Sequence, residues 1–221
     1  HVPLLFSCLS FSINDDYKVL LFVKQSFYAE TYRVKGNDGK LYFLKLFNFS
    51  QLHKSAFDDD NNILEIELLK SIQHPNLVTY KDSGEIVIES KKYAYLVLDF
   101  IAGETLSEKI IREKYNSLYD IKNVVVGILE GLKYLHQQAN PIIHNEITIQ
   151  NVMLDLSGQI TIPKIIDFGY ARFLSQSNKD FQKEGLNPFY TANETFNKVF
   201  SVQSDIFSVG ALYYHLLVGL P

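Results

Sequence analysis

One short segment of the chain combines residue types that could do chemistry: residues 144–155 read HNEITIQNVMLD. In it a carboxylate, Glu146, stands five residues before an amide, Asn151, and an apolar strand is expected to follow directly. A carboxylate in a loop can orient a hydroxyl group, because it accepts the hydrogen of that hydroxyl. The segment is therefore a candidate catalytic loop, or the altered remains of one.

The elements that must position this loop change character near residue 100. Before it, stretches rich in Tyr, Phe, Val and Leu alternate with polar turns such as GNDG, which predicts antiparallel strands. These stretches are YKVLLFV, FYAETYRVKG, KLYFLKLF, NLVTYKDSGEIVI and KYAYLVLDF. One helix is expected to interrupt them, with the acidic residues 58–60 near its positive N-terminal end. Its apolar positions are Ile63, Ile66, Leu69 and Ile72.

After residue 100, helices are expected to dominate. Residues 118–138 place one broad apolar face across a core, formed by Ile121, Val124, Val125, Ile128, Leu129, Leu132 and Leu135. Residues 199–220, VFSVQSDIFSVGALYYHLLVGL, approach the length of a membrane span. In such a span, Gln203 and Asp205 would lie deep in the hydrocarbon at a cost of a few kcal/mol each. We therefore expect a buried helix of a globular domain and no membrane insertion.

Composition excludes several classes of protein. The chain has 221 residues, 47% of them hydrophobic and 21% charged, enough for one large domain or two small lobes. A net charge of −4 and the lack of any long Lys/Arg run argue against a nucleic-acid partner. The single cysteine, Cys8, cannot form an internal disulfide, and neither a CxxC nor an HExxH motif offers zinc ligands. A reducing, cytoplasmic location is expected.

The N-terminal stretch HVPLLFSCLSFSI is apolar but lacks the basic residues and the cleavage site of a signal peptide. We expect it to form a first strand. Because the chain starts at His1 rather than at Met, we also expect it to be part of a longer protein.

Several segments occur in the order found in the protein kinase family, and the chain resembles that family over nearly its whole length. They are YLHQQANPIIHNEITIQNVMLD, IIDFGYARF, PFYTANE and SDIFSVGALYYHLLVGLP. The resemblance implies an α+β, two-lobed fold that holds Mg-ATP in the cleft between its lobes. Residues 1–100 would form a β-rich N-lobe with one regulatory helix, and residues 101–221 a mainly helical C-lobe, truncated at its C-terminal end. Residues 98–106 would form the hinge.

By this resemblance, Lys45 in YFLKLF matches the strand lysine that contacts the α- and β-phosphates. A compact ammonium on a flexible stem suits that role. Its expected partner is Glu65, which lies nine residues before His74 as in the family's pattern. Glu67 is the competitor, and two residues along a helix correspond to a turn of about 200°, so only one of the two glutamates can face the lysine.

The resemblance also supplies a magnesium site and a nucleotide pocket. Asp167 of DFG and Asn151 would give oxygen ligands to magnesium, a hard cation that favours them. Leu98 falls at the position that gates the back of the adenine pocket, and the backbone from Asp99 to Ile101 would bind the adenine edge. The family's loop histidine, here His144, has a structural role.

The chain departs from the family in the loop that covers the phosphates. Where the family has three glycines, residues 24–34 read KQSFYAETYRV. Those glycines let backbone N–H groups approach phosphate without interference from a Cβ. Their positions are taken by Lys24, Ser26 and Ala29, so phosphate binding is expected to be weaker than usual.

The candidate catalytic loop departs as well. The family's HRD is HNE here, so Glu146 replaces the catalytic aspartate and Asn145 the preceding arginine. One extra methylene displaces the carboxylate by about 1 Å, which can cost roughly 100-fold in rate. Thr148 replaces a lysine that neutralises the transferring phosphate. Since Asn145 cannot grip a phosphate as an arginine does, the loop that carries Ser175 and Ser177 is expected to be arranged independently of phosphorylation.

Two functions of different class remain open. The first is a slow Ser/Thr-type protein kinase that uses ATP and Mg on a protein substrate. The second is a pseudokinase, a nucleotide-binding or scaffolding module that regulates a partner domain. A small-molecule phosphotransferase of related fold is a third, and the peptide-kinase segments PFYTANE and SDIFSVG argue against it.

Overall fold

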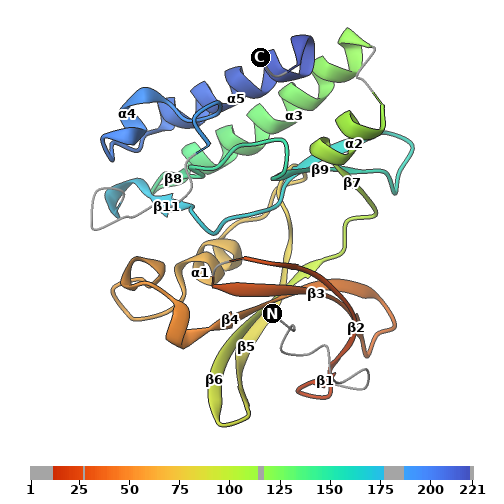
Figure 1. Cartoon of the computed structure of the whole chain (residues 1–221), viewed down its shortest axis with the longest axis vertical. Coiled ribbons are helices and arrows are strands. Elements are labelled where there is room, and N and C mark those ends of the chain that lie inside the picture. The colour runs from red at the N-terminus through yellow and green to blue at the C-terminus, as the bar shows by residue number, and fades with distance from the viewer. Residues whose placement is uncertain (1–11, 27, 114–116, 177–186, 220–221) are drawn as a thin grey trace. The chain divides into compact units, whose positions relative to one another are not determined.

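The structure is a computed structural model, and it describes residues 12–26, 28–113, 117–176 and 187–219. By their internal contacts the residues group into two compact units: residues 1–56 with 79–100, and residues 57–78 with 101–221. The first unit is built around a β-sheet and the second is mainly helical (Figure 1). The predicted α+β class is therefore confirmed, whereas most of the predicted first strand lies in residues 1–11, outside the described residues.

Within the described part of the first unit, the sheet has six strands, all antiparallel to their neighbours, in the order β1-β2-β3-β4-β6-β5. The strands are β1 (Ser12–Ile13), β2 (Tyr17–Gln25), β3 (Ala29–Gly36), β4 (Leu41–Asn48), β5 (Tyr80–Ile88) and β6 (Lys91–Asp99). Two short 3-10 helices follow β4, at Phe49–Gln51 and Lys54–Ala56. The five aromatic and β-branched stretches of the sequence thus form strands, because their side chains suit a pleated, half-buried surface.

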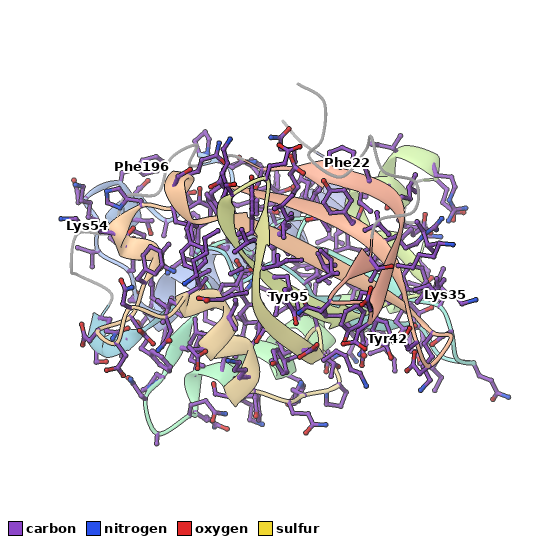
Figure 2. All side chains as sticks on the ribbon, turned by 90° about the horizontal axis from the view of Figure 1, so that it is seen from below. Phe22, Lys35, Tyr42, Lys54, Tyr95 and Phe196 are labelled. Atoms are coloured by element: carbon purple, nitrogen blue, oxygen red, sulfur yellow. The ribbon has the colours of Figure 1, made fainter. Side chains whose placement is uncertain are left out.

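Alternation along β4 separates two faces of this sheet. One face contributes Tyr42, Leu44 and Leu46 to a buried core that also includes Tyr32, Val34, Tyr95 and Val97. Tyr42 and Tyr95 are labelled in Figure 2. The Tyr42 hydroxyl donates to Asp38 Oδ2 at 2.6 Å, and the Tyr17 hydroxyl donates to Asp82 Oδ2 at 3.1 Å. The opposite face of β4 carries Phe43, Lys45 and Phe47.

The second unit contains five described α-helices and two small described sheets. The helices are α1 (Leu64–Ser71), α2 (Leu106–Arg112), α3 (Leu118–His136), α4 (Asn193–Phe196) and α5 (Val202–Val218). The strands are β7 (Gly103–Thr105), β8 (Ile142–Ile143), β9 (Val152–Asp155), β10 (Ile162–Ile165) and β11 (Arg172–Phe173), paired in the orders β10-β9-β7 and β11-β8. A 3-10 helix, Leu174–Gln176, follows β11.

The first helix of this unit differs from its prediction at the N-terminal end. Helix α1 begins at Leu64 with Ile63 as its N-cap, and the acids in its first turn are Glu65 and Glu67. Asp58 instead accepts backbone N–H groups of Asp60 and Asn62 at 3.0 and 2.8 Å. The expectation that residues 58–60 lie at the helix end is therefore wrong, because Asp58 organises a separate turn before it.

Helix α3 agrees with the sequence pattern over most of its length. Ser117 caps it by accepting the N–H of Asp120, and α3 and α5 pack side by side (Figure 1). The buried positions include Ile121, Val124, Ile128, Leu132 and Leu135. Leu129 is 36% exposed, so the buried face is narrower than predicted.

Helix α5 is buried on one face only. A capping box between Ser201 and Ser204 starts the helix, and its buried face includes Val209, Leu212 and Leu216. The other face exposes Ile206, Phe207, Tyr213, Tyr214 and Leu217. The expectation of a wholly buried helix is therefore wrong for that face. Among the helices of the described ranges, none combines the length and the apolar character needed to cross a membrane.

Candidate active site

The candidate catalytic loop runs from the end of β8 to the start of β9 in the second unit. His144 is fully buried, and its ring meets that of Phe168 edge-on with 5.0 Å between ring centroids. Its Nδ1 accepts the backbone N–H of Glu146 at 3.2 Å, which makes the neutral tautomer protonated on Nε2 the one compatible with this bond. His144 therefore shapes the loop from the inside, in keeping with the structural role implied by the resemblance.

The carboxylate and the amide that first marked this loop lie in contact. Asn151 Nδ2 donates to Glu146 Oε2 at 3.0 Å and to the Glu146 backbone oxygen at 3.1 Å. Asn151 is buried and Glu146 is half-buried. Because the same amide nitrogen holds both the backbone and the carboxylate of Glu146, the side chain of Glu146 is fixed toward Asn151.

Asn151 and Asp167 flank the same end of a β-hairpin. In that hairpin Val152, the first residue of β9, pairs with Ile165, the last residue of β10. Beyond this pair the backbone N–H of Ile166 donates to the Asn151 oxygen at 3.0 Å. Asp167 follows directly, and its Oδ1 accepts the Gly169 N–H at 3.2 Å. The hairpin therefore brings the amide and the carboxylate of the predicted metal site to one edge of the second unit.

These two residues fit a magnesium ion by their chemistry. A carboxylate and an amide oxygen are hard ligands, and magnesium is commonly held by one or two such groups together with substrate phosphates and water. Among the described residues, the Asn151 side chain makes its hydrogen bonds through Nδ2, so Oδ1 is the atom it offers to a cation. The described residues contain no cluster of three or more His, Cys, Asp or Glu side chains that would hold a metal alone.

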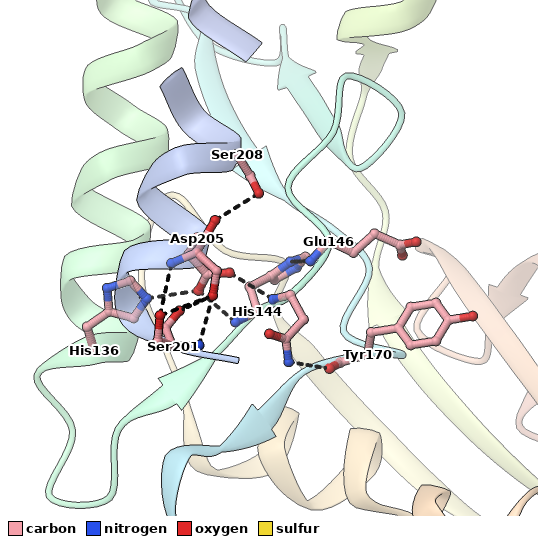
Figure 3. Close-up of polar contacts among 9 residues, drawn as sticks. His136, His144, Glu146, Tyr170, Ser201, Asp205 and Ser208 are labelled. Atoms are coloured by element: carbon pink, nitrogen blue, oxygen red, sulfur yellow. Dashed lines mark hydrogen bonds and ion pairs between the residues drawn. The ribbon is translucent and has the colours of Figure 1, made fainter. Parts of the chain in front are cut away.

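A buried aspartate of α5 holds the backbone of the catalytic loop, and the sequence alone did not identify it. Asp205 is 1% exposed, and its two oxygens accept the backbone N–H groups of His144 and Asn145, both at 2.8 Å. His136 at the end of α3 contacts Asp205 Oδ2 through Nε2 at 2.9 Å (Figure 3). An acid within the apolar stretch of α5 was the available signal.

Asn145 links the loop to the segment after DFG. Its Nδ2 donates to the Tyr170 backbone oxygen at 3.0 Å (Figure 3). Its backbone has φ 66°, a left-handed conformation that asparagine tolerates better than most residues. Close by in sequence, Arg172 and Phe173 of β11 pair with Ile143 and Ile142 of β8. The start of the predicted activation segment is thus attached directly to the catalytic loop, whereas Ser177 lies outside the described residues.

The two candidate partners of Lys45 have different environments on α1. Glu65 is 6% exposed, whereas the Glu67 carboxylate forms a surface ion pair with Lys70 at 2.8 Å. Of the two, Glu65 is the buried one. Lys45 belongs to the first unit and Glu65 to the second, so their pairing stays a prediction.

In the first unit, Lys45 is 9% exposed and projects from β4. The turn between β2 and β3 is closed by Ser26. The backbone N–H of Ser26 donates to the Ala29 oxygen at 2.8 Å, and the Ala29 N–H donates to Ser26 Oγ at 3.2 Å. These amides are therefore engaged within the turn itself, where a glycine loop would direct them to a phosphate.

The predicted adenine-binding residues lie at the end of β6 and just after it. Leu98 is buried and paired with Phe43 of β4 and Tyr80 of β5. The Asp99 N–H donates to the Thr79 oxygen at 3.0 Å within the first unit, and Ile101 is buried in the second unit. Because the predicted pocket would take residues from both units, it stays a prediction.

A buried tyrosine–histidine pair lies behind the loop. The Tyr190 hydroxyl and His215 Nδ1 of α5 are 2.6 Å apart. Burial raises the pKa of Tyr190 to about 12 and lowers the pKa of His215. A small pocket of about 10 Å³ borders Tyr190. Its lining includes Glu146, Thr148, Asn187, Thr191 and Ser208.

Comparison with known proteins gives a consistent result. The family description "Protein kinase domain" matches residues 26–221. Calcium-dependent protein kinase 4 of Plasmodium berghei is 29% identical over 211 residues, which is 94% of this chain and 38% of that protein. Calcium/calmodulin-dependent protein kinase type II of Caenorhabditis briggsae is 31% identical over 216 residues, 97% of this chain and 39% of that protein.

Ribosomal protein S6 kinase 2 alpha of Gallus gallus is 35% identical over 167 residues, 73% of this chain and 21% of that protein. The chain thus spans less than half the length of the relatives it matches. The family match, by contrast, covers most of the chain. The ordered motifs, the β-sheet first unit and the mainly helical second unit agree with it, and the chain belongs to the protein kinase family.

Proposed function

We propose that this chain is the core of a slow, magnesium-dependent protein kinase of the Ser/Thr type, in which Glu146 positions the acceptor hydroxyl. The observation that carries the proposal is the contact between Glu146 Oε2 and Asn151 Nδ2 at 3.0 Å. It keeps a carboxylate beside a predicted magnesium ligand despite the substitution of the catalytic aspartate.

Each residue has a defined task in this proposal. Lys45 binds phosphate oxygens as a cation, while Asn151 Oδ1 and the Asp167 carboxylate bind magnesium. Glu146 accepts a hydrogen bond from the acceptor hydroxyl and orients its oxygen. Mg-ATP, when bound, would supply the phosphoryl group, and its magnesium ion would neutralise part of the phosphate charge. Because phosphoryl transfer depends mostly on positioning and electrostatics, a misplaced carboxylate slows the reaction without abolishing it.

Two features support a low rate. The additional methylene of Glu146 shifts its carboxylate by about 1 Å, a displacement that can cost roughly 100-fold. Thr148 stands where the family has a lysine, so one cation near the transferring phosphate is missing. The acceptor is proposed to be a serine or threonine of a protein substrate, and the location to be the cytoplasm.

A pseudokinase is the second candidate, and one observation favours it. The N–H groups of Ser26 and Ala29 are engaged in the closed β2–β3 turn, which reduces what this turn can offer to phosphates. In that case the chain would bind nucleotide weakly or not at all, and would act as a scaffold that regulates a partner domain.

Transfer of radiolabelled γ-phosphate to peptide pools that contain Ser, Thr or Tyr as the sole acceptor distinguishes the two candidates. We expect slow, magnesium-dependent labelling of the Ser and Thr pools that is lost in Asp167→Asn. Asp155→Asn, at the half-buried last residue of β9, where the carboxylate accepts hydrogen bonds from Ser157, is the matched control and should label normally. Nucleotide binding without any labelling would favour the pseudokinase.

A further inference from the structure

The ammonium of Lys45 lies against two aromatic rings of its own unit. Lys45 Nζ is 5.8 Å from the ring centroid of Tyr28 and 5.3 Å from that of Phe47. Phe47 is 1% exposed and Tyr28 is half-buried. Both distances fall within the range in which a cation is attracted by the face of an aromatic ring, about 6 Å.

The sheet explains why these three side chains meet. In the register of β3 and β4, Ala29 pairs with Phe47 and Thr31 with Lys45. Residues two apart on a strand share a face, so Lys45 and Phe47 project to the same side of β4. Tyr28 directly precedes Ala29, and its backbone oxygen accepts the Asn48 N–H at 3.4 Å. The end of β4 therefore holds the turn so that Tyr28 reaches Lys45.

A second set of hydrogen bonds lies next to Tyr28. Ser26 Oγ donates to the Ala29 oxygen at 3.1 Å and accepts the Ala29 N–H at 3.2 Å. These bonds hold Ala29, the residue after Tyr28, whereas Tyr28 itself is held through the bond between its backbone oxygen and the Asn48 N–H.

We infer that Tyr28 is a positioning residue for Lys45 and that, through Lys45, it sets the affinity for a nucleoside triphosphate. The two rings attract the ammonium, replace part of its hydration and limit its rotamers. The Lys45 side chain is then already ordered when phosphate oxygens bind to it, which lowers the entropic cost of binding. The inference rests on the proposed function, because affinity can be measured only if nucleotide binds.

The experiment compares Tyr28→Leu, which removes the ring, with Tyr28→Phe, which keeps it. Isothermal titration with Mg-ATP should show a roughly 3- to 10-fold weaker affinity for Tyr28→Leu, as expected for the loss of one cation–π contact. Tyr28→Phe should bind as the parent does. Tyr119→Leu, which removes a ring that is exposed on α3, is the matched control.

A double-mutant cycle tests whether the effect passes through Lys45. In the Lys45→Met background, Tyr28→Leu should cause no further loss, because the cation that the ring positions is absent. An equal loss in both backgrounds would overturn the inference. A gain in affinity on Tyr28→Leu would overturn it too, since the ring would then be excluding nucleotide.

A second measurement needs no nucleotide. In proton–carbon NMR spectra, the Lys45 ε-methylene, assigned by its disappearance in Lys45→Met, should move downfield in Tyr28→Leu and stay in place in Tyr28→Phe. An unmoved resonance in Tyr28→Leu would overturn the inference whatever the nucleotide data. A moved resonance in a chain that binds no Mg-ATP would instead reject the proposed function and leave the positioning of Lys45 by Tyr28 standing.

Discussion

The carboxylate of Glu146 and the side-chain amide of Asn151 are joined by a hydrogen bond of 3.0 Å. The same amide nitrogen also binds the Glu146 backbone oxygen, so the longer side chain is folded back onto its own loop. If Glu146 takes the place of the family's catalytic aspartate, as proposed, these two bonds restrain its carboxylate within the loop. The question to be tested is how a displaced carboxylate, rather than a missing one, changes the rate of phosphoryl transfer.

Shortening the Glu146 side chain should raise activity. If Glu146 positions the acceptor hydroxyl, Glu146→Asp returns the carboxylate by about 1 Å and should increase phosphoryl transfer roughly 10- to 100-fold. Glu146→Gln removes the charge and should lower transfer below that of the parent. Single-turnover phosphorylation of a Ser/Thr peptide measures all three. Glu130→Gln, on an exposed position of α3, is the control. Equal rates for the three Glu146 proteins would show that the carboxylate takes no part.

Opening the β2–β3 turn should strengthen nucleotide binding. Ser26→Gly with Ala29→Gly removes the hydroxyl that engages the Ala29 N–H and the Cβ that limits close approach. We expect Mg-ATP to bind roughly 3- to 10-fold more tightly, since the amide of residue 29 becomes available to phosphate. Titration calorimetry gives the affinity. Gln25→Gly adds a glycine to the same hairpin and leaves the Ser26 bonds in place. An equal gain in affinity for Mg-ATP in Gln25→Gly would show that backbone flexibility, and not the released amide, causes the tighter binding.

The hydrogen bond from the Asn145 side chain to Tyr170 should stabilise the segment after DFG without any phosphorylation. Asn145→Gly keeps the left-handed backbone, whose φ is 66°, and removes the hydrogen bond to Tyr170. Loss of this bond should cost about 1 kcal/mol of local stability. Hydrogen exchange of residues 170–174 should therefore quicken about fivefold.

Phosphorylation of the activation segment should have no effect on activity. In the parent, an upstream kinase acting on Ser175 should leave the activity unchanged. A large rise confined to the phosphorylated parent, and absent in Ser175→Ala, would contradict this account.

Stability should fall as the pH drops below about 6.5. Burial lowers the pKa of His215 and of His74, so below the unfolded value of 6.5 the unfolded chain binds more protons than the folded chain. The free energy of unfolding is then lost progressively as the pH falls through the folded pKa values. Urea titrations between pH 7.5 and about 5 should show a shallower loss for His215→Gln. His53→Gln, at an exposed site, is the control. If the free energy of unfolding depends on pH in His215→Gln as it does in the parent, His215 does not contribute to the loss of stability.

The elements with strong local patterns could be predicted from the sequence. The aromatic strands β2 to β6 and the helix α3 were found because alternation and a periodic apolar face are properties of a few neighbouring residues. The start of α1 was not, since Asp58 binds its own turn. The exposed face of α5 was also missed, because an apolar segment does not reveal which of its faces another element covers.

The candidate site was predictable only where a motif carries it. The assignments of Lys45, Asn151 and Asp167 come from their places in known motifs and stay predictions. The choice of Glu65 comes from its spacing to His74, since helix geometry alone says only that Glu65 and Glu67 face different ways. Asp205 was missed because its role depends on backbone N–H groups of His144 and Asn145, which lie 61 and 60 residues away in the chain. The rings around Lys45 were missed for a similar reason. Tyr28 meets the lysine because the register of β3 and β4 and its bond to Asn48 bring it to the end of β4.

The central claim is that this chain binds Mg-ATP through Lys45 and Asp167, and thermal unfolding tests it most directly. Ligand that binds only the folded state raises the melting temperature by mass action. Millimolar ATP should raise it when magnesium is present, less without magnesium, and much less in Lys45→Met or Asp167→Asn. The control Lys54→Met, at an exposed position, should respond as the parent does. An unchanged melting temperature of the parent at millimolar Mg-ATP, or an equal rise in Lys45→Met, would contradict the account.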